Sequence, residues 1–190
     1  MHGSVQIFAV ALLALAAGDS ARADDSAARR YELPNLDTLE LVLPAGWKDS
    51  VDMPPGEAEL TIQLGPIAGD PFEVFLTPAS PDRTAPTVPD VDTLRSAVRD
   101  AASRVQPQAV EENLEIRRLQ GADGVGFYFS ATEREPQAED FQFMTQGALL
   151  VGELTLWFTI LTHEGQEQVV ADALAMLQAA VHRGTGADQH

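Results

Sequence analysis

The segment from residue 141 to residue 181 constrains the fold more than any other part of this chain. Residues 141–162 hold two runs of β-branched and aromatic residues that meet at Gly152, so we expect a β-hairpin that turns there. The residues that follow predict a helix, because their apolar side chains recur at steps of three and four. This stripe consists of Val169, Val170, Leu174, Leu177 and Val181. It needs an apolar surface to cover, so we expect the helix to pack on the strand formed by residues 154–162.

Three further strands are expected near the start of the chain. Residues 39–43, 60–64 and 72–77 alternate apolar with polar side chains, and Pro and Gly residues separate them. Residues 48–56 have the composition of a loop. The three strands are therefore expected to form a meander.

A long helix and a second hairpin are expected between the meander and the last hairpin. Asp90 suits the N-cap of a helix over residues 92–105, whose apolar residues form a stripe. Residues 114–116 and 125–131 predict two strands joined by a Gly-Ala-Asp-Gly turn. Runs of strands separated by single helices favour an α+β fold with a largely antiparallel β-sheet flanked by helices.

The domain boundaries follow from length and from the ends of these patterns. The chain has 190 residues, 45% of them hydrophobic, which suffices for one substantial core and is short for two domains. We expect a single α+β domain over residues 31–183 and a disordered tail over residues 184–190. His182 and Arg183 suit the C-terminal end of the last helix, where the helix dipole favours positive charge.

The first residues have the pattern of a secretory signal peptide. An apolar run that is short for a bilayer span is followed by the small-residue site Ala21-Arg22-Ala23. Cleavage near Ala23 would remove residues 1–23 as the signal peptide and leave residues 24–30 as a flexible leader. The mature protein would be periplasmic or secreted, without stable insertion in a membrane. An uncleaved anchor is the alternative.

The net charge is −17, from 29 acidic and 12 basic residues. This charge repels phosphates and anionic lipid head groups, so nucleic acid is not expected as a partner. The acidity suits a soluble protein, and an acidic docking surface is the alternative. The chain has no cysteine, so it forms no disulfide and has no thiol nucleophile.

The sequence shows no pattern of catalytic or ligand-binding residues. It contains no Gly-x-Ser-x-Gly elbow, and His163, His182 and His190 lie in separate segments, which does not favour a three-histidine metal site. The glycines around Val125 precede a strand instead of opening a helix, unlike a phosphate-binding loop. We therefore predict no catalytic residues, no metal ligands and no cofactor.

Three short motifs are similar to those of a known family. Residues 43–47 read Leu-Pro-Ala-Gly-Trp, residues 126–129 read Gly-Phe-Tyr-Phe, and residues 156–161 read Leu-Trp-Phe-Thr-Ile-Leu ahead of the last helix. In this order of elements the chain resembles the PsbP-like proteins, a group that includes the bacterial DcrB-like proteins. The resemblance implies a PsbP-like α/β sandwich that binds or escorts other proteins, and it supplies no catalytic residues.

Two hypotheses on function follow. The first is an exported, non-enzymatic accessory or adaptor protein that binds a protein partner in the periplasm. The alternative is a small-ligand-binding protein or an enzyme, with a cleft built from scattered carboxylates and aromatic residues that spacing alone does not reveal. The sequence does not indicate the oligomeric state.

A partner-binding face is predicted from strand alternation. Trp157 and Thr159 point to one side of their strand, because successive side chains alternate between faces. Two helices do not suffice to cover both sides of the sheet, so we expect this side to stay half open, together with Tyr128 and Ser130 if the neighbouring hairpin aligns that way. Coverage by the proline-rich segment at residues 78–89, or by the leader, is the alternative.

Overall fold

The computed structural model describes residues 26–33, 37–52, 60–79, 88–137 and 140–184. The predicted signal peptide and most of the predicted tail lie outside the described residues. The described chain contains ten strands, two α-helices and one short 3-10 helix, η1. In chain order they are β1 (Ala27–Glu32), β2 (Thr38–Leu43), β3 (Trp47–Asp52), β4 (Thr61–Pro66), β5 (Glu73–Ala79), α1 (Val91–Val105), η1 (Gln106–Gln108), β6 (Arg117–Gln120), β7 (Val125–Thr132), β8 (Phe143–Val151), β9 (Leu154–Thr162), α2 (Glu167–Gln178) and β10 (Val181–Arg183).

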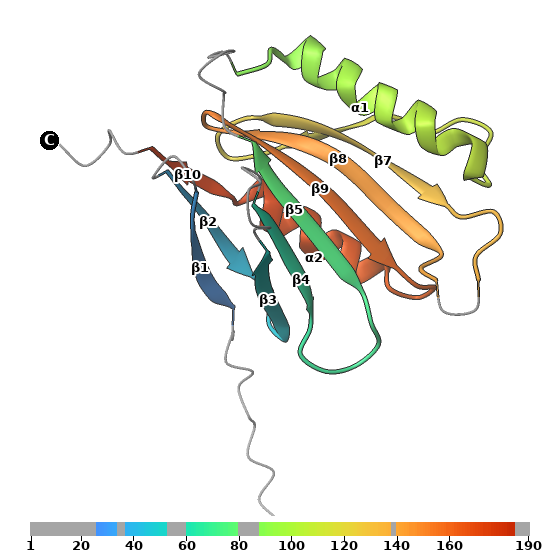
Figure 1. The fold of residues 1–190 in the computed structure, drawn as a ribbon, viewed down its shortest axis with the longest axis horizontal. Coiled ribbons are helices and arrows are strands. Elements are labelled where there is room, and N and C mark those ends of the chain that lie inside the picture. Colours follow the sequence, from blue (N-terminus) through green and yellow to red (C-terminus); the bar gives the residue numbers. More distant parts are fainter. Residues whose placement is uncertain (1–25, 34–36, 53–59, 80–87, 138–139, 185–190) are drawn as a thin grey trace, which may run out of the picture.

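The strands form two sheets. The larger has seven strands in the order β3-β4-β5-β9-β8-β7-β6, and the smaller has three in the order β1-β2-β10. Every pairing within them is antiparallel. Helix α1 runs along β7 and β8, whereas α2 lies behind the large sheet and beside the small one (Figure 1). This arrangement confirms the predicted α+β class with antiparallel sheet and flanking helices.

The predicted hairpin and its helix are confirmed. Strands β8 and β9 pair along their whole length, and Gly152 takes a φ of 59° in the turn, which favours glycine. Helix α2 packs on β9 and buries Ala173, Met176 and Leu177. The hairpin and α2 therefore supply much of the core, as the sequence indicates.

The end of this helix was predicted wrongly. Helix α2 ends at Gln178, whose carbonyl accepts a hydrogen bond from the Ala122 N–H in the turn between β6 and β7. Val181, His182 and Arg183 form β10 and pair with β2. Their backbone groups gain ladder partners in the small sheet, and this long-range gain decides against another helical turn.

Three edge segments were also predicted wrongly. Residues 27–30, expected in the leader, form most of β1. Residues 48–52, expected in a loop, belong to β3, while the first predicted strand, residues 39–43, lies in the small sheet, so the meander is β3-β4-β5. Strand β6 occupies Arg117–Gln120 instead of residues 114–116. Strands β1, β3 and β6 pair on one side only and carry mostly exposed side chains, so they lack the apolar alternation that marks a strand in sequence.

Two apolar cores lie on opposite faces of the large sheet. The α2-side core joins both sheets and includes Leu39, Leu41, Leu156, Phe158 and Leu177. The α1-side core is smaller and includes Leu94, Val98, Phe127, Phe129 and Ala148. Helix α1 is capped as predicted, because the Asp90 carboxylate accepts a 2.7 Å hydrogen bond from the Thr93 N–H.

The first prediction concerns the packing of α2. Leu177 is 0% exposed in the α2-side core, so Leu177→Ala is expected to lower the free energy of unfolding by about 2–5 kcal/mol. Urea denaturation measures this change. Ala171→Ser, at an exposed position of the same helix, is the control and should shift stability by about 0.5 kcal/mol or less. An unchanged midpoint for Leu177→Ala would contradict the assigned packing.

The second prediction concerns close packing over β8. A Cβ atom added at Gly147 would lie 2.7 Å from Cζ of Phe158, and closer still to the carbonyl oxygen of Phe127. Because a backbone atom in a central ladder cannot move aside, Gly147→Ala is expected to cost about 1–3 kcal/mol or more. Gly65→Ala is the matched strand control, since its nearest neighbour would be the Phe72 carbonyl oxygen at 3.4 Å. Equal effects of the two substitutions in thermal denaturation would refute this packing.

Candidate functional site

The structure places the four predicted partner-binding residues on two different faces. Trp157 and Thr159 face the α1 side, where Trp157 packs at the margin of the α1-side core. Tyr128 lies opposite Gly147 in the β7–β8 ladder, and Ser130 lies opposite Thr145, so both face the α2 side. The neighbouring hairpin therefore does not align so as to bring Tyr128 and Ser130 to the side of Trp157 and Thr159. The role of all four residues in partner binding stays a prediction.

Trp157 and Thr159 belong to a part of the sheet that we call the open face. It consists of Phe75, Thr77, Gln146, Trp157 and Thr159 on β5, β9 and β8, and each of these side chains is half-buried. Helix α1 lies over β7 and β8 beside it, and no described helix lies over β5 on this side (Figure 1). Most of the proline-rich segment lies outside the described residues, and residues 27–30 pair with β2 in the small sheet.

The polar groups on and beside the open face bind one another. The side-chain amide of Gln146 donates a 3.1 Å hydrogen bond to the hydroxyl of Thr159, and the hydroxyls of Thr61 and Thr77 lie 3.5 Å apart. Phe75 lies directly opposite Thr159 in the β5–β9 ladder, and Trp157 lies opposite Thr77. The result is a mixed surface of aromatic rings, hydroxyls and amides, which is typical of protein-docking surfaces.

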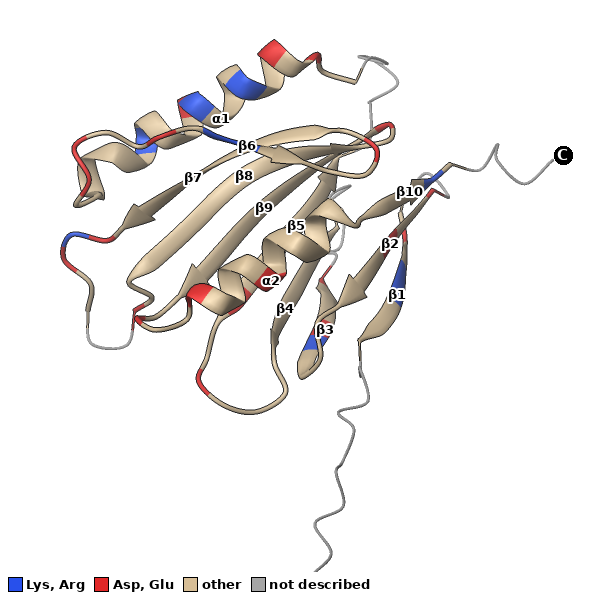
Figure 2. Ribbon diagram, turned by 180° about the vertical axis from the view of Figure 1, so that it is seen from behind, with Lys and Arg blue, Asp and Glu red and all other residues tan. Residues whose placement is uncertain are grey.

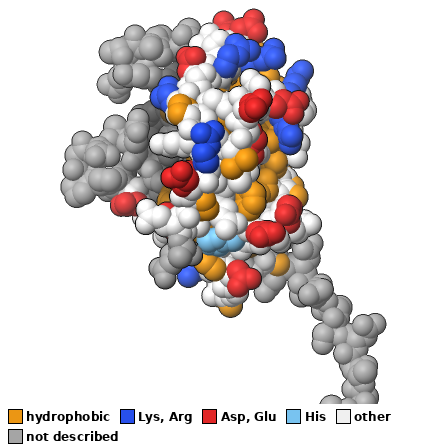
Figure 3. Space-filling model, turned by 90° about the vertical axis from the view of Figure 1, so that its right-hand side faces the viewer, with side chains coloured by type: hydrophobic (Ala, Val, Ile, Leu, Met, Phe, Trp, Pro, Cys, Tyr) orange, Lys and Arg blue, Asp and Glu red, His pale blue; other side chains and the backbone are white. Residues whose placement is uncertain are grey.

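A second feature, which we call the hydroxyl hollow, lies on the α2 side where β7 and β9 end and β8 begins. It has a volume of about 270 Å³. Its polar lining consists of Glu111, Ser130, Thr132, Thr145, Thr162, His163 and Glu167, and its apolar lining includes Phe143, Met144 and Val170. Figure 3 faces this end of the molecule and shows hydrophobic side chains among acidic and basic ones, with a histidine nearby. Of the predicted residues, only Ser130 lies here.

Glu111 is held firmly at the rim of the hollow. Its two carboxylate oxygens accept hydrogen bonds from the N–H of Thr132 at 2.9 Å and from the Thr132 hydroxyl at 2.7 Å. Partial burial raises the pKa of Glu111, but these two hydrogen bonds to the charged form outweigh it and lower the pKa below its ordinary value. Glu111 is therefore ionised at neutral pH. From sequence, Glu111 and Glu112 are interpreted as solvated surface charge, and nothing local indicates this contact, because Thr132 lies 21 residues away.

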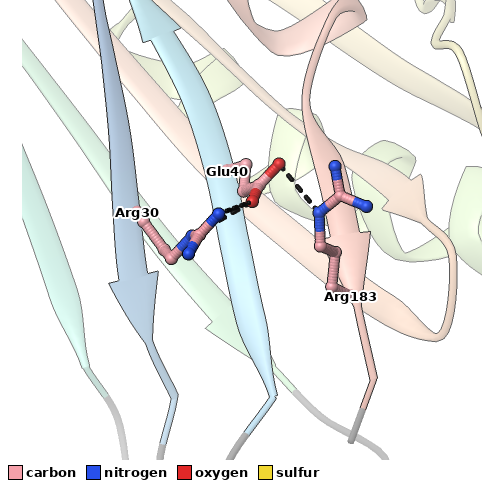
Figure 4. Close-up of polar contacts among 3 residues, drawn as sticks. All are labelled: Arg30, Glu40 and Arg183. Carbon is pink, nitrogen blue, oxygen red and sulfur yellow. Dashed lines mark hydrogen bonds and ion pairs between the residues drawn. The ribbon is translucent and has the colours of Figure 1, made fainter. Parts of the chain in front are cut away.

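A cluster of charges crosses the outer surface of the small sheet (Figure 4). Arg30 Nη2 lies 2.8 Å from one oxygen of Glu40, and Arg183 Nε lies 2.9 Å from the other. Hydrogen bonds from Arg183 and Arg30 hold the pKa of Glu40 below its ordinary value. One carboxylate thus joins all three strands of this sheet, since the three residues belong to β1, β2 and β10.

Asp49 of β3 ties the small sheet to the large one. Its oxygens accept hydrogen bonds from Arg29 Nε and from the Tyr31 hydroxyl, both at 3.1 Å. Burial raises the pKa of Tyr31, and the neighbouring charge of Asp49 raises it further.

Basic side chains otherwise gather on α1 and β6, whereas acidic ones are spread over the loops, strands and helices (Figure 2).

Two further features of the described residues bear on function. In this part of the chain, no three His, Asp or Glu side chains lie together as ligands that could hold a metal ion. None of its helices is long and apolar enough to cross a membrane.

Comparison with known proteins identifies the fold. No protein-family model and no curated protein matches the sequence. The crystal structure of LpqN, described as involved in cell envelope biogenesis of Mycobacterium tuberculosis, is similar with a TM-score of 0.52 and 9% identity, over 84% of this chain and 91% of LpqN. The solution structure of cyanobacterial PsbP (CyanoP) from Synechocystis sp. PCC 6803 is similar with a TM-score of 0.51 and 10% identity, over 86% of this chain and 97% of CyanoP.

The chain has a PsbP-like fold. This confirms the fold that the sequence resemblance implied, including the sandwich of sheet and helices. At such low identities the likeness shows the fold alone. The DcrB-like part of the resemblance stays a prediction.

The third prediction concerns the pH dependence of the charge cluster. The folded-state pKa of Glu40 is lowered from an ordinary value of 4.5, so its contribution to stability is present above pH 4.5 and is lost as pH falls through the folded-state pKa. Glu40→Gln is therefore expected to destabilise the protein at pH 7, and the difference from wild type should shrink below about pH 4.5. Urea denaturation at several pH values measures it, with the exposed Glu32→Gln as control. A difference that stays constant with pH would contradict the role of the carboxylate.

Proposed function

We propose that this protein is an exported, non-enzymatic accessory or adaptor protein that binds a protein partner in the periplasm through the open face. The observation that carries this proposal is the position of Phe75 and Trp157. Both side chains are half-buried: Phe75 lies on β5, over which no described helix lies on this side, and Trp157 lies beside it at the margin of the α1-side core. Aromatic residues ringed by polar groups are enriched at the centres of protein interfaces.

The comparisons support an envelope location without assigning it. One protein of this fold is described as involved in cell envelope biogenesis, and the start of this chain has the pattern of a secretory signal. Both fit an extracytoplasmic accessory protein. The open face offers rings, amides and hydroxyls that suit contact with another protein surface.

The fourth prediction tests the open face. Phe75→Ser and Trp157→Ala are expected to abolish capture of a reproducible protein partner from envelope extracts, because they remove the aromatic anchors of the face. Val42→Ser is the control, since Val42 is 48% exposed on the outer face of the small sheet. Circular dichroism is recorded for each variant. Phe75→Ser is the more informative of the two, because Trp157 also packs at the margin of the α1-side core.

A photo-crosslinking residue gives the direct readout. With Thr77→p-benzoylphenylalanine, the captured partner should be cross-linked at the open face, whereas the same residue at position 42 should give no such product. A folded Phe75→Ser variant that still captures the partner, or cross-linking only from position 42, would exclude the open face as the docking site.

A further inference from the structure

The hydroxyl hollow holds buried polar groups where the rest of the sheet face is apolar. Among the described residues, three threonines are buried, and two of them, Thr145 and Thr162, line this hollow at 4% and 3% exposure. Toward the middle of the sheet, the residues of β9 that point to the same face as Thr162 are core residues such as Leu156 and Phe158. Burying polar groups is unfavourable unless they find partners, so this end of the face is not built as ordinary core.

The register brings these groups together in two rows. Thr132, Phe143 and Thr162 stand side by side across β7, β8 and β9, and the next row contains Ser130 and Thr145. The hydroxyls of Ser130 and Thr145 lie 2.9 Å apart and satisfy one another. The hydroxyl of Thr162 makes no hydrogen bond to any other described residue, although its side chain is 3% exposed and lines the hollow.

The titratable side chains that line the hollow are two carboxylates and the imidazole of His163. Glu111 and Glu167 line it, and no Lys or Arg is among its lining residues. Glu111 is fixed in place by Thr132, as described above, and Glu167 lies in the first turn of α2. A ligand with a negative group would be repelled, and a positive group would be attracted to both carboxylates.

The remaining walls are apolar. Phe143 and Val170 line the hollow beside the hydroxyls, and both are half-buried. Met144 contributes to the lining, but it packs against the α1-side core on the other face of the sheet. A volume of about 270 Å³ is slightly below the range of roughly 300–1,000 Å³ for ligand sites, which favours a compact molecule. The occupant therefore needs an apolar body of roughly one ring and a polar, positively charged end.

We infer that the hydroxyl hollow is a binding site for a small organic cation, an ammonium group on a compact apolar body. The carboxylates of Glu111 and Glu167 attract the charge, and the Ser and Thr hydroxyls accept its N–H groups. The apolar body packs against Phe143 and Val170. This site lies on the α2 side, opposite the open face, so it is independent of the proposed docking surface.

Three matched probes test the inference on the full mature protein. Benzylamine, benzyl alcohol and benzoate share one apolar body and carry a positive, a neutral and a negative end at neutral pH. Titrations followed by protein NMR should show benzylamine binding at least about tenfold more tightly than benzyl alcohol, and benzoate not binding. The amide shifts should centre on Thr145 and Thr162, with none at Thr77 of the open face. Benzylamine that does not bind at millimolar concentration, or that binds no better than the alcohol, would overturn the inference.

Single substitutions distinguish the loss of one charge in the hollow from a general effect on the protein. Glu167→Gln should weaken benzylamine binding about tenfold and leave benzyl alcohol unchanged, because only the charged probe loses an interaction. Glu164→Gln is the matched control, since Glu164 is exposed and does not line the hollow. Thr162→Val, which keeps the shape of the side chain, should also weaken benzylamine binding. Equal effects of Glu167→Gln and Glu164→Gln would show only long-range attraction by an acidic protein and would refute the site.

Discussion

The packing of α2 between two sheets is the interaction on which the rest of this structure depends. Leu177 and Ala173 of the helix belong to the same core as Leu39 and Leu41 of β2 and Leu156 of β9. Small sheets are stable only when a hydrophobic face is buried, and the apolar residues of β2 are buried in this shared core, so the small sheet depends on it. Hydrogen bonds from Arg29 and Tyr31 to Asp49 then fix its position against β3. Burial supplies the cohesion, and these polar contacts specify the relative placement of the sheets.

The elements that were predictable from sequence are those whose pattern is local and apolar. The last hairpin, α1, α2 and the fold class follow from periods of two and about 3.6, which burial on one face imposes. Strands β1 and β3 escaped prediction because their mostly exposed side chains lack apolar alternation, and β10 because its residues become strand only by pairing with the distant β2. Val181 shows this clearly, since it continues the helical stripe in sequence and yet pairs with Glu40. Likewise, alternation identified residues 39–43 as a strand but carried no information on which sheet they join.

For a related reason, only part of the predicted partner-binding face could be derived from the sequence. That Trp157 and Thr159 share a face follows from alternation within one strand. Which residues of the neighbouring hairpin join them depends on cross-strand register, and a shift of one residue moves a side chain to the other face. In the actual register Tyr128 lies opposite Gly147 and packs against the α2-side core. No local signal in the sequence could have decided between the two alignments.

The two sheet faces differ because each helix covers only part of its face. Helix α1 covers β7 and β8 and leaves the α1 side of β5 open, whereas α2 covers β9 and the small sheet and leaves the far end of β7 and β8 uncovered (Figures 1 and 2). The side chains suit this division. Half-buried rings such as Phe75 occur on the first uncovered region, and hydroxyls such as Thr145 on the second. Had the second region been apolar, it would have gained by extending the core, so its hydroxyls and carboxylates indicate that the end of this face serves a polar occupant.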